Sequence, residues 1–511
     1  MHDIRYAIRA LRKQPLFTLV AVLTLTLGIG ANTAIFSLLY QVLLRPLPYP
    51  DADRLVFVWN MYPLMGLPQA SVSIPDYIDR KTQAPAIEDA TLFSGVSANL
   101  ADGGQPEQVR ALMVTPSFFT TLRRQPFLGG GYTEDEARPN ADNFVILSYG
   151  LWQSRFGGDR SLVGRDIRMN GEAYRVVGVM GADFRLTNDV GVYVPFAFTP
   201  QQMSDQARGN EFSQMIARLM PCATIDQLNG QMKMIVERNL ERLPQRQAFA
   251  RSSGFGGFAV DIRQQLVGEA RTPLYALQGV VLAVLLIACA NVANLLLMRA
   301  TGRYRELAIR TTLGAGHWRL VRQMITEGLV LSGLGGVAGY LLGEWVNRAY
   351  MSRLDLGADL PLRFDVSFDL NVFLFSFGAA VATGVAIALW PAWGASRAHA
   401  RAALHDGGKS QSDGADRQRI RRLLVVGQIS GALALLVVAG LFVRTLTAAQ
   451  EIDLGFDARH LITARLDPKQ IGYTEERTNE FYKELQRRVA AWPDVASVAV
   501  AFTPPMSYLI A

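Results

Sequence analysis

Long apolar stretches recur along the 511-residue chain and alternate with polar segments. Five of them reach the length of about 20 residues that a helix needs to cross a ~30 Å hydrocarbon layer. They are Leu16–Leu44, Leu274–Met298, Ile325–Val346, Leu370–Ala395 and Leu423–Leu446. The pattern predicts an α-helical transmembrane bundle with five crossings. The first stretch is too long for a signal peptide and lacks a convincing cleavage site, so we expect it to remain as an anchor.

Basic residues gather in three of the polar segments between the crossings. These segments are 1–15, 299–322 and 397–422, and they hold 17 of the 51 Lys and Arg residues but only 5 of the 44 Asp and Glu residues. Because short cytoplasmic loops are rich in Lys and Arg, we expect the amino terminus and all three segments inside. Residues 46–273, 348–369 and the chain end then lie outside. Membrane orientation accounts for the net charge of +7, so no nucleic-acid partner is expected.

The polar region 46–273 is long enough for one or two folded units and is predicted to be a large α/β domain. The pair Asn170-Gly171 between two strand-like stretches predicts a hairpin, because both residues tolerate positive φ. Thr224 and Gln227 have the spacing of a capping box, which predicts a helix that runs to about Leu243. Further strands and helices are predicted at Leu55–Trp59, Pro75–Lys81, Phe144–Leu147, Tyr149–Phe156, Ile167–Met169, Tyr174–Val179 and Phe258–Arg263.

Small and polar residues inside the apolar stretches indicate close packing between helices. Gly335, Gly339 and Gly343 recur every fourth residue, a row that lets two helix backbones approach each other closely. Three amides are costly in lipid and are expected to face neighbouring helices. They are Gln278, Asn291 and Asn294.

The amino-terminal segment 1–15 has the pattern of a helix that lies on the membrane surface. Ile4, Ala7, Ile8 and Leu11 share one face of residues 3–14, and basic residues surround it. Basic side chains in this arrangement are suited to anionic lipid headgroups. We therefore expect a cytoplasmic interfacial helix in contact with membrane lipid.

A charged segment separates the second and third crossings, and part of it has a helical pattern. Tyr304, Leu307, Ala308 and Thr311 fall at i, i+3, i+4 and i+7 and form a narrow apolar stripe. Two interpretations stay open: the basic residues merely hold this loop in the cytoplasm, or the stripe docks on a partner. The candidate contact residues are Arg303, Arg305, Glu306, Leu307, Arg310, Gly314 and Ala315.

A short repeat indicates an internal duplication. Asp51-Ala-Asp-Arg-Leu-Val56 is followed 406 residues later by Asp457-Ala-Arg-His-Leu-Ile462, and an apolar crossing precedes each copy. Residues 448–511 would then begin a second outer domain, and the chain would be incomplete at its carboxyl end. That domain is expected to start as a β-α-β unit with elements at Leu461–Leu466, Thr474–Ala491 and Val495–Phe502.

Catalytic, cofactor and metal motifs are not found in the sequence, so the chain is not expected to be an enzyme. Ala403–Ser410 imitates a phosphate loop, but Ala403 replaces its first glycine. The five histidines do not have metal-ligand spacing. Cys222 falls in the outer region and Cys289 in a crossing, so no disulfide is expected.

Taken together, the chain resembles permeases of the MacB and FtsX type, and among them the acidobacterial-type duplicated orphan permeases. The amino-terminal likeness lies in Asp3–Lys13, Leu27–Phe36 and Leu44–Pro48. Val145–Trp152, Arg155–Gly158 and Val176–Val179 are similar to the MacB-type periplasmic core domain. Arg305–Arg310, Leu313–Ala315 and Glu327 are similar to the family's loop that faces an ATPase. The chain departs from the family at Gly129-Gly-Gly131, where an arginine is expected after the first glycine.

The resemblance implies a series of domains in a bacterial cytoplasmic (inner) membrane protein. They are an interfacial helix (1–15), a first crossing (16–45), a MacB-like periplasmic core domain (46–273), a second crossing (274–298), a coupling loop (299–323), a third crossing (324–347), an outer loop (348–369), a fourth crossing (370–395) that completes an FtsX-like permease domain (274–395), a cytoplasmic linker (396–421), a fifth crossing (422–447) and the beginning of a second periplasmic domain (448–511).

The resemblance also implies a function and partners. The leading expectation is a permease subunit of an ABC-type export complex, in which a separate cytoplasmic ATPase binds ATP and drives movement of the periplasmic domains. The alternative is an FtsX-like membrane protein that regulates an envelope enzyme or a signalling partner, and a third is an adhesive scaffold. A periplasmic adaptor or hydrolase is a further candidate partner, and a dimer or a pseudo-dimer from internal duplication is expected.

Overall fold

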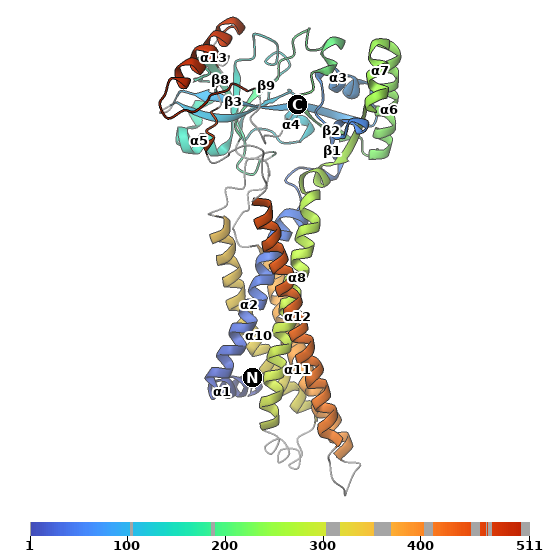
Figure 1. Ribbon diagram of the computed structural model, residues 1–511, viewed down its shortest axis with the longest axis vertical. Helices are drawn as coiled ribbons and strands as arrows, with labels where there is room; N and C mark the ends of the chain where they lie inside the picture. The colour runs from blue at the N-terminus through green and yellow to red at the C-terminus, as the bar shows by residue number, and fades with distance from the viewer. Residues whose placement is uncertain are drawn as a thin grey trace. The chain divides into compact units, whose positions relative to one another are not determined.

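The computed structural model describes residues 2–102, 106–184, 186, 190–302, 317–351, 369–402, 412–450, 460–464, 466, 468 and 473–501. The chain divides into two compact units (Figure 1). The membrane unit consists of Met1–Arg45, Glu269–Leu356 and Arg363–Asp457. The outer unit consists of Pro46–Gly268, Gly357–Leu362 and Ala458–Ala511.

The membrane unit is helical. Its helices are α1 (His2–Arg12), α2 (Pro15–Leu39), which continues as the π-helical turn η1 (Tyr40–Leu44), α8 (Ile262–Gly302), α10 (His317–Met351), α11 (Leu370–Ala402) and α12 (Ser412–Gln450). Pro15 occupies the start of α2, where its missing N–H costs no hydrogen bond. Within the described residues, five spans are long and apolar enough to cross a membrane, which confirms the five predicted crossings. They are Pro15–Leu44, Ala270–Leu296, Arg322–Ala349, Leu370–Ala388 and Val425–Ala448.

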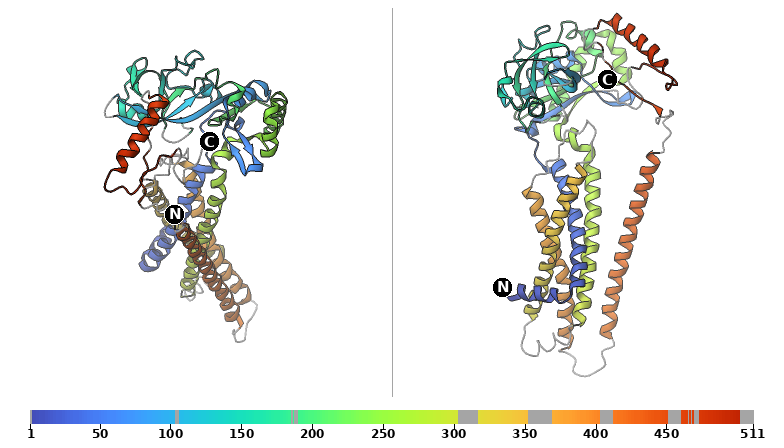
Figure 2. Two further views of the ribbon diagram at one scale, coloured as in Figure 1. Left: turned by 45° about the horizontal axis from the view of Figure 1, so that its top comes forward. Right: turned by 90° about the vertical axis from the view of Figure 1, so that its left-hand side faces the viewer.

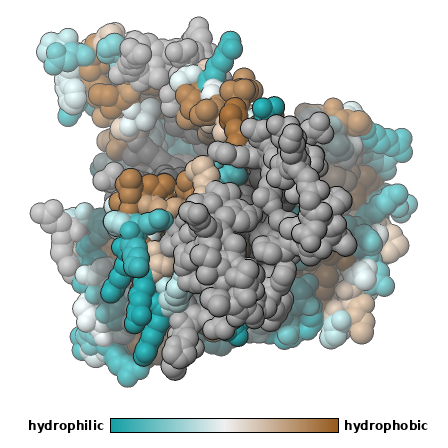
Figure 3. Space-filling model, turned by 90° about the horizontal axis from the view of Figure 1, so that it is seen from below, coloured by the Kyte–Doolittle hydropathy of each residue, from teal (hydrophilic) through white to brown (hydrophobic). Residues whose placement is uncertain are grey.

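Much of the apolar surface of these helices is exposed. Leu19, Leu23 and Leu27 of α2 are more than half exposed, and so are Ile429 and Leu433 of α12. Apolar residues also form patches beside polar ones on the face seen in Figure 3. Exposed side chains of this kind suit contact with lipid tails, as expected for spans that cross a bilayer.

Helix α1 is amphipathic, but protein covers part of its apolar face. Ala7 and Leu11 are fully buried, and Leu11 belongs to the hydrophobic cluster that contains Leu25 of α2 and Leu331 of α10. The hydroxyl of Thr18 donates a hydrogen bond to the carbonyl of Leu11 over 2.8 Å. Ile8, by contrast, is 40% exposed. Ala7 and Leu11 of the predicted face therefore pack α1 on the helix bundle, and contact of this helix with membrane lipid stays a prediction.

The outer unit contains one mixed sheet of eleven strands within the described residues. The strands are β1 (Leu55–Tyr62), β2 (Leu67–Ala70), β3 (Ile87–Leu100), β4 (Glu107–Val114), β5 (Leu128–Gly129), β6 (Phe144–Leu147), β7 (Asp166–Met169), β8 (Glu172–Val179), β9 (Val190–Pro195), β10 (Gln214–Leu219) and β11 (Gly256–Asp261). Their order is β11-β1-β10-β3-β4-β9-β6-β8-β5, with β2 beside β1 and β7 beside β3 and β8. The β4–β9 and β6–β8 pairs are parallel and the other pairs are antiparallel.

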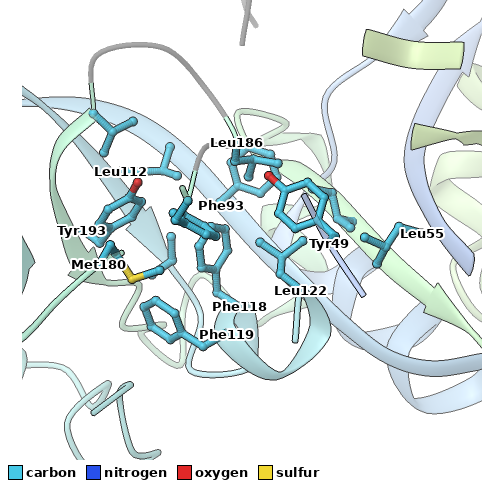
Figure 4. Packing of buried hydrophobic residues seen from close by; sticks show 14 of the residues in the cluster. Tyr49, Leu55, Phe93, Leu112, Phe118, Phe119, Leu122, Met180, Leu186 and Tyr193 are labelled. Atoms are coloured by element: carbon cyan, nitrogen blue, oxygen red, sulfur yellow. The ribbon is translucent and has the colours of Figure 1, made fainter. Parts of the chain in front are cut away.

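Helices accompany this sheet and help to bury it on both faces (Figure 2). They are α3 (Ile74–Gln83), α4 (Phe118–Thr121), α5 (Tyr149–Phe156), α6 (Ile225–Arg242) and α7 (Pro244–Ser253). Helix α13 (Glu475–Ala490) follows much later in the chain, and most of its residues are not buried. Alternate residues of β1 enter different cores, because successive strand side chains point to opposite faces. Phe57 packs in an aromatic core with Phe93 and Phe118, whereas Val56 and Val58 pack in a second core with residues of α3 and α6. Figure 4 shows Phe93 and Phe118 in the aromatic core.

Most local predictions for the outer domain are confirmed. The hairpin forms at Asn170 and Gly171, whose φ angles are 53° and 85°. Thr224 and Gln227 form the capping box of α6, and Phe144–Leu147 and Tyr149–Phe156 have the predicted bounds. The predicted strand Phe258–Arg263 lies two residues earlier, because Ile262 begins α8.

Two strands predicted for a second outer domain are wrong for the residues that the structure describes. Residues 461–464 and 495–501 have no regular structure, and Ile462 is 94% exposed. An apolar segment becomes a strand only where a neighbouring strand pairs with its backbone, and neither segment pairs with a described strand. The helix between them is confirmed as α13, and the Thr474 side chain caps its first turn.

Candidate functional site

The predicted coupling residues lie outside the part of the chain that the structure describes. Arg303, Arg305, Glu306, Leu307, Arg310, Gly314 and Ala315 all fall between the end of α8 at Gly302 and the start of α10 at His317. The described residues do show what the loop connects. It joins α8, which follows β11, to α10, which packs against α1, α2 and α11.

Helix α10 packs directly against α2 through the predicted glycine row. A Cβ atom built on Gly335 would lie 2.7 Å from Leu25 Cβ, and one on Gly339 would lie 3.0 Å from the backbone nitrogen of Gly30. A Cβ on Gly343 would lie 3.1 Å from the carbonyl oxygen of Gly30. All three positions face α2 at backbone distance, so only glycine allows this approach without a shift of the helices.

A second glycine row on α10, which the sequence analysis missed, packs against α11. A Cβ on Gly336 would lie 2.6 Å from Ala380 Cβ, and one on Gly328 would lie 2.5 Å from the carbonyl oxygen of Gly384. The spacing of eight residues between Gly328 and Gly336 was the available signal. Helix α10 is therefore held between α2 and α11 by close contacts on two of its faces.

Hydrogen bonds from polar side chains connect α2 to α8 and α11. Asn32 donates to the carbonyl of Val281 over 2.7 Å and accepts from Gln278 over 3.1 Å. The hydroxyls of Thr33 and Ser376 lie 2.9 Å apart. Each such bond within a membrane contributes roughly 0.6 to 2 kcal/mol to helix association. The prediction for Gln278 is confirmed, since its amide faces α2.

The other two predicted amides differ from each other. Asn294 is half-buried, whereas Asn291 is exposed at the surface of the described residues. The prediction for Asn291 is therefore wrong. A helix has several faces, and the chemistry of one amide does not specify which face the neighbouring helices cover.

The outer unit fixes the chain segment that follows α2. Arg218 of β10 is buried and donates to the carbonyls of Asp51 and Pro50 over 3.1 Å each. It also donates from Nε to the carbonyl of Thr121 over 2.8 Å. Burial lowers the pKa of Arg218 to about 10, and it remains protonated at neutral pH. The segment from α2 to β1 is thus attached to the sheet by a buried cation.

The sheet connects to α2 and α8 at neighbouring points. Val56 near the start of β1 pairs with Asp261 at the end of β11. Helix α8 begins at the next residue, Ile262, which is fully buried in the aromatic core of the outer unit. The segment that follows α2 therefore leads into β1, and α8 follows β11, the strand that pairs with β1.

Comparison with protein families identifies two domains in the chain. Residues 18–235 match the MacB-like periplasmic core domain, and residues 279–400 match the FtsX-like permease C-terminal domain. The resemblance to permeases of the MacB and FtsX type is confirmed for these two domains, and the narrower likeness to duplicated orphan permeases stays a prediction.

Curated relatives include exporters from two bacteria. The chain is 27% identical over 303 residues to the macrolide export ATP-binding/permease protein MacB of Wolinella succinogenes, a match that covers 58% of this chain and 43% of the relative. It is 27% identical over 290 residues to the pyoverdine export ATP-binding/permease protein PvdT of Pseudomonas syringae pv. syringae, which covers 56% and 41%. The matched region spans less than half the length of each relative.

Solved structures with similarity to the chain include two outer domains. The periplasmic region of MacB from Actinobacillus actinomycetemcomitans is 13% identical, with a TM-score of 0.30, over 43% of this chain and 94% of that one. The extracellular domain of the ABC-type transporter YknZ from Gram-positive bacteria is 16% identical, with a TM-score of 0.28, over 37% and 94%.

Proposed function

We propose that this chain, a multi-pass inner-membrane protein with a MacB-like periplasmic core domain and an FtsX-like permease domain, is the permease subunit of an ABC-type export complex. A separate cytoplasmic ATPase would bind and hydrolyse ATP, and this chain would transmit the resulting motion to its outer domain. The exported molecule is then moved by the outer domain rather than through a channel lined by the five spans.

The packing of α10 is the observation that carries this proposal. The charged loop 303–315 leads directly into α10, and α10 contacts α2 at backbone distance through Gly335 and Gly339. Helix α2 leads in turn into the segment that Arg218 attaches to the sheet. A force on the loop therefore has a continuous route through packed residues to β1. Contacts through glycine suit the transmission of motion between helices, because few side-chain atoms separate the two backbones.

The orientation that the proposal needs is supported by charge. Basic residues are concentrated in the segments 1–15, 299–322 and 397–422, as expected of cytoplasmic segments. The loop 303–315 would then face the ATPase, and the sheet would lie in the periplasm. The printed names of the relatives combine ATP binding with permease activity, and we assign the nucleotide site to a partner because this sequence has no phosphate-loop motif.

Charge reversal in the loop tests the contact with the ATPase. The double variant Arg305→Glu/Arg310→Glu is expected to reduce both co-purification of the ATPase and stimulation of its activity by the reconstituted full chain. Arg401→Glu in the linker 396–421 is the matched control, because it reverses a basic charge outside the loop. Undiminished co-purification and undiminished stimulation in the double variant would exclude this loop as the contact.

Regulation of an envelope enzyme is the second candidate, favoured by the match of residues 279–400 to the FtsX-like domain. In that case the same motion would activate a periplasmic hydrolase or a signalling partner, and no molecule would be exported. The two functions separate by what co-purifies with the outer domain: an adaptor in export or a hydrolase in regulation. A dimer or an internally duplicated pseudo-dimer fits both.

A further inference from the structure

The segment between α2 and β1 is stiff by its sequence. Residues 46–54, which we call the connector, belong to the outer unit, and proline occupies every second position at its start, in Pro46, Pro48 and Pro50. Each proline fixes its own φ at about −65° and holds the residue before it in an extended conformation. Arg45, the last residue of the membrane unit, has this conformation, with φ −62° and ψ 129°.

The two side chains between these prolines pack on the aromatic core of the outer unit. Tyr49 is 6% exposed, and its ring lies edge-on to the ring of Phe184 with the centroids 6.4 Å apart. Figure 4 shows Tyr49 in this core. Leu47 is partly buried and packs against the same core. The connector is therefore part of the packed outer unit and does not behave as a free loop.

The backbone carbonyls of the connector are held by arginine side chains. Because proline has no N–H, the connector has more carbonyls than N–H groups, and donors must come from elsewhere. Arg124 donates from Nε to the carbonyl of Pro48 over 2.6 Å. Arg218 donates to the carbonyls of Pro50 and Asp51 over 3.1 Å each. Two guanidinium groups thus bind three carbonyls of the connector.

Both arginines also bind a second part of the outer unit. Arg218 is buried and donates from Nε to the carbonyl of Thr121 at the end of α4 over 2.8 Å. Arg124 donates from Nη1 to the carboxylate of Asp183, after β8, over 3.0 Å. The rigid planar fork of a guanidinium group suits such bridging, because its donors point in fixed directions. Each arginine therefore attaches the connector to a separate part of the fold.

A strained backbone accompanies this attachment. Asp51 and Arg123 have φ angles of 49° and 52°, a region that residues other than glycine rarely adopt. Arg123 donates to the carboxylate of Asp51 and, over 2.9 Å, to that of Glu88. Strained residues persist only where surrounding contacts hold them. The two strained residues are bound to each other, which indicates that the position of the connector is closely specified.

We propose that Arg124 and Arg218 are positioning residues that make the connector rigid, so that a displacement of α2 passes to β1 without being absorbed. A flexible segment of nine residues has an r.m.s. end-to-end distance of about 15 to 18 Å and would take up such a displacement. The role of the connector in export rests on the proposed function. Its rigid attachment needs neither ATP nor a partner and can be measured on the chain alone.

The distance between two spin labels tests the attachment, with the full chain in nanodiscs and without nucleotide. One label is placed on Arg45→Cys and the other on the native Cys222, both exposed, in a Cys289→Ala background. Double electron–electron resonance is expected to give one narrow distance distribution for the otherwise unchanged chain. Arg124→Ala/Arg218→Gln is expected to widen this distribution at least twofold, because the connector is released from the sheet.

Two controls separate release of the connector from general damage. Labels on Cys222 and Gln108→Cys, which is exposed on β4, report on the outer unit itself, and their distribution should keep its width in the double variant. Arg168→Ala removes an exposed arginine of β7 and should leave both distributions unchanged.

Equal width of the Arg45→Cys distribution with and without Arg124 and Arg218 would overturn the proposal. Arg124 is partly exposed, so Arg124→Ala alone decides by the same comparison where loss of the buried Arg218 disturbs the outer unit. Failure of the ATPase contact would appear in the loop variant Arg305→Glu/Arg310→Glu and would leave these distances unchanged. The two proposals therefore fail separately.

Discussion

The contact between α2 and α10 predicts a specific cost for a single added methyl group. Gly335→Ala would place a Cβ atom 2.7 Å from Leu25 Cβ, and the optimum separation of two carbon atoms is about 3.5 to 4.0 Å. Leu25 Cβ cannot move away by rotation, because it is bonded to the backbone of α2. The helices must therefore separate by about 1 Å or accept the overlap.

The magnitude follows from known costs of overpacking, which are about 1 to 3 kcal/mol for an inserted methyl group. An opposing gain exists, because Ala is more favourable than Gly within a helix by about 1 kcal/mol. Gly333 on the same helix provides the control, since a Cβ there would meet nothing within 4 Å. Gly333→Ala gains the same helix propensity without any overlap of atoms. The difference in unfolding free energy between the two variants therefore isolates the packing cost.

The assay is reversible unfolding of the purified full chain by SDS in mixed micelles, followed by circular dichroism. We expect Gly335→Ala to be less stable than Gly333→Ala by about 1 to 3 kcal/mol. Equal stability of the two variants within 0.5 kcal/mol, taken as roughly the additivity limit of such comparisons, would refute the reasoning.

Two further predictions concern buried polar groups. Burial raises the pKa of Glu211 from 4.5 to about 7, so between these pH values the folded state keeps a proton that the unfolded state has lost. The free energy of unfolding should therefore fall as pH rises from about 4.5 to about 7 and then level off. Because Glu211 is partly exposed, we expect this fall to be on the order of 2 kcal/mol. The variant Glu211→Gln keeps an oxygen that accepts hydrogen bonds from Tyr62 and Asn60 but cannot titrate. Urea unfolding between about pH 4.5 and 8 should therefore depend less on pH in this variant than in the wild type. An unchanged pH dependence would contradict the assignment of the effect to Glu211. Asn32→Leu should reduce stability in SDS by about 1 kcal/mol, because it removes the hydrogen bonds to Val281 and Gln278. Asn291 is exposed, so Asn291→Leu should have little effect. Equal effects of the two substitutions would count against the interhelical bonds.

Much of the local structure could be predicted because its causes are local. The hairpin at Asn170-Gly171 depends on two adjacent residues, and the capping box of α6 depends on residues three apart. The apolar spans follow from length and composition alone. The strand order around β1 could not be predicted, because its neighbours β10 and β11 lie more than 150 residues away in the sequence.

The glycine row and the attachment of the connector also differ in how far the sequence predicts them. The row Gly335, Gly339 and Gly343 is visible as a regular spacing on one helix, whereas that spacing does not specify that the row packs against α2. The attachment brings Arg124 and Arg218 to the connector, and these residues share no spacing in the sequence. Strand-like composition at residues 461–464 and 495–501 was misleading, because pairing partners decide whether such segments become strands.

The central claim is that the charged loop and the sheet-containing domain lie on opposite sides of the membrane and are joined by packed helices. Labelling of cysteines in intact spheroplasts with a membrane-impermeant maleimide tests it most directly. The native Cys222 is exposed in the outer unit and should react from outside, whereas Arg310→Cys in a Cys222→Ser background should react only after permeabilisation. Reaction of both cysteines from the same side of the membrane would contradict the account.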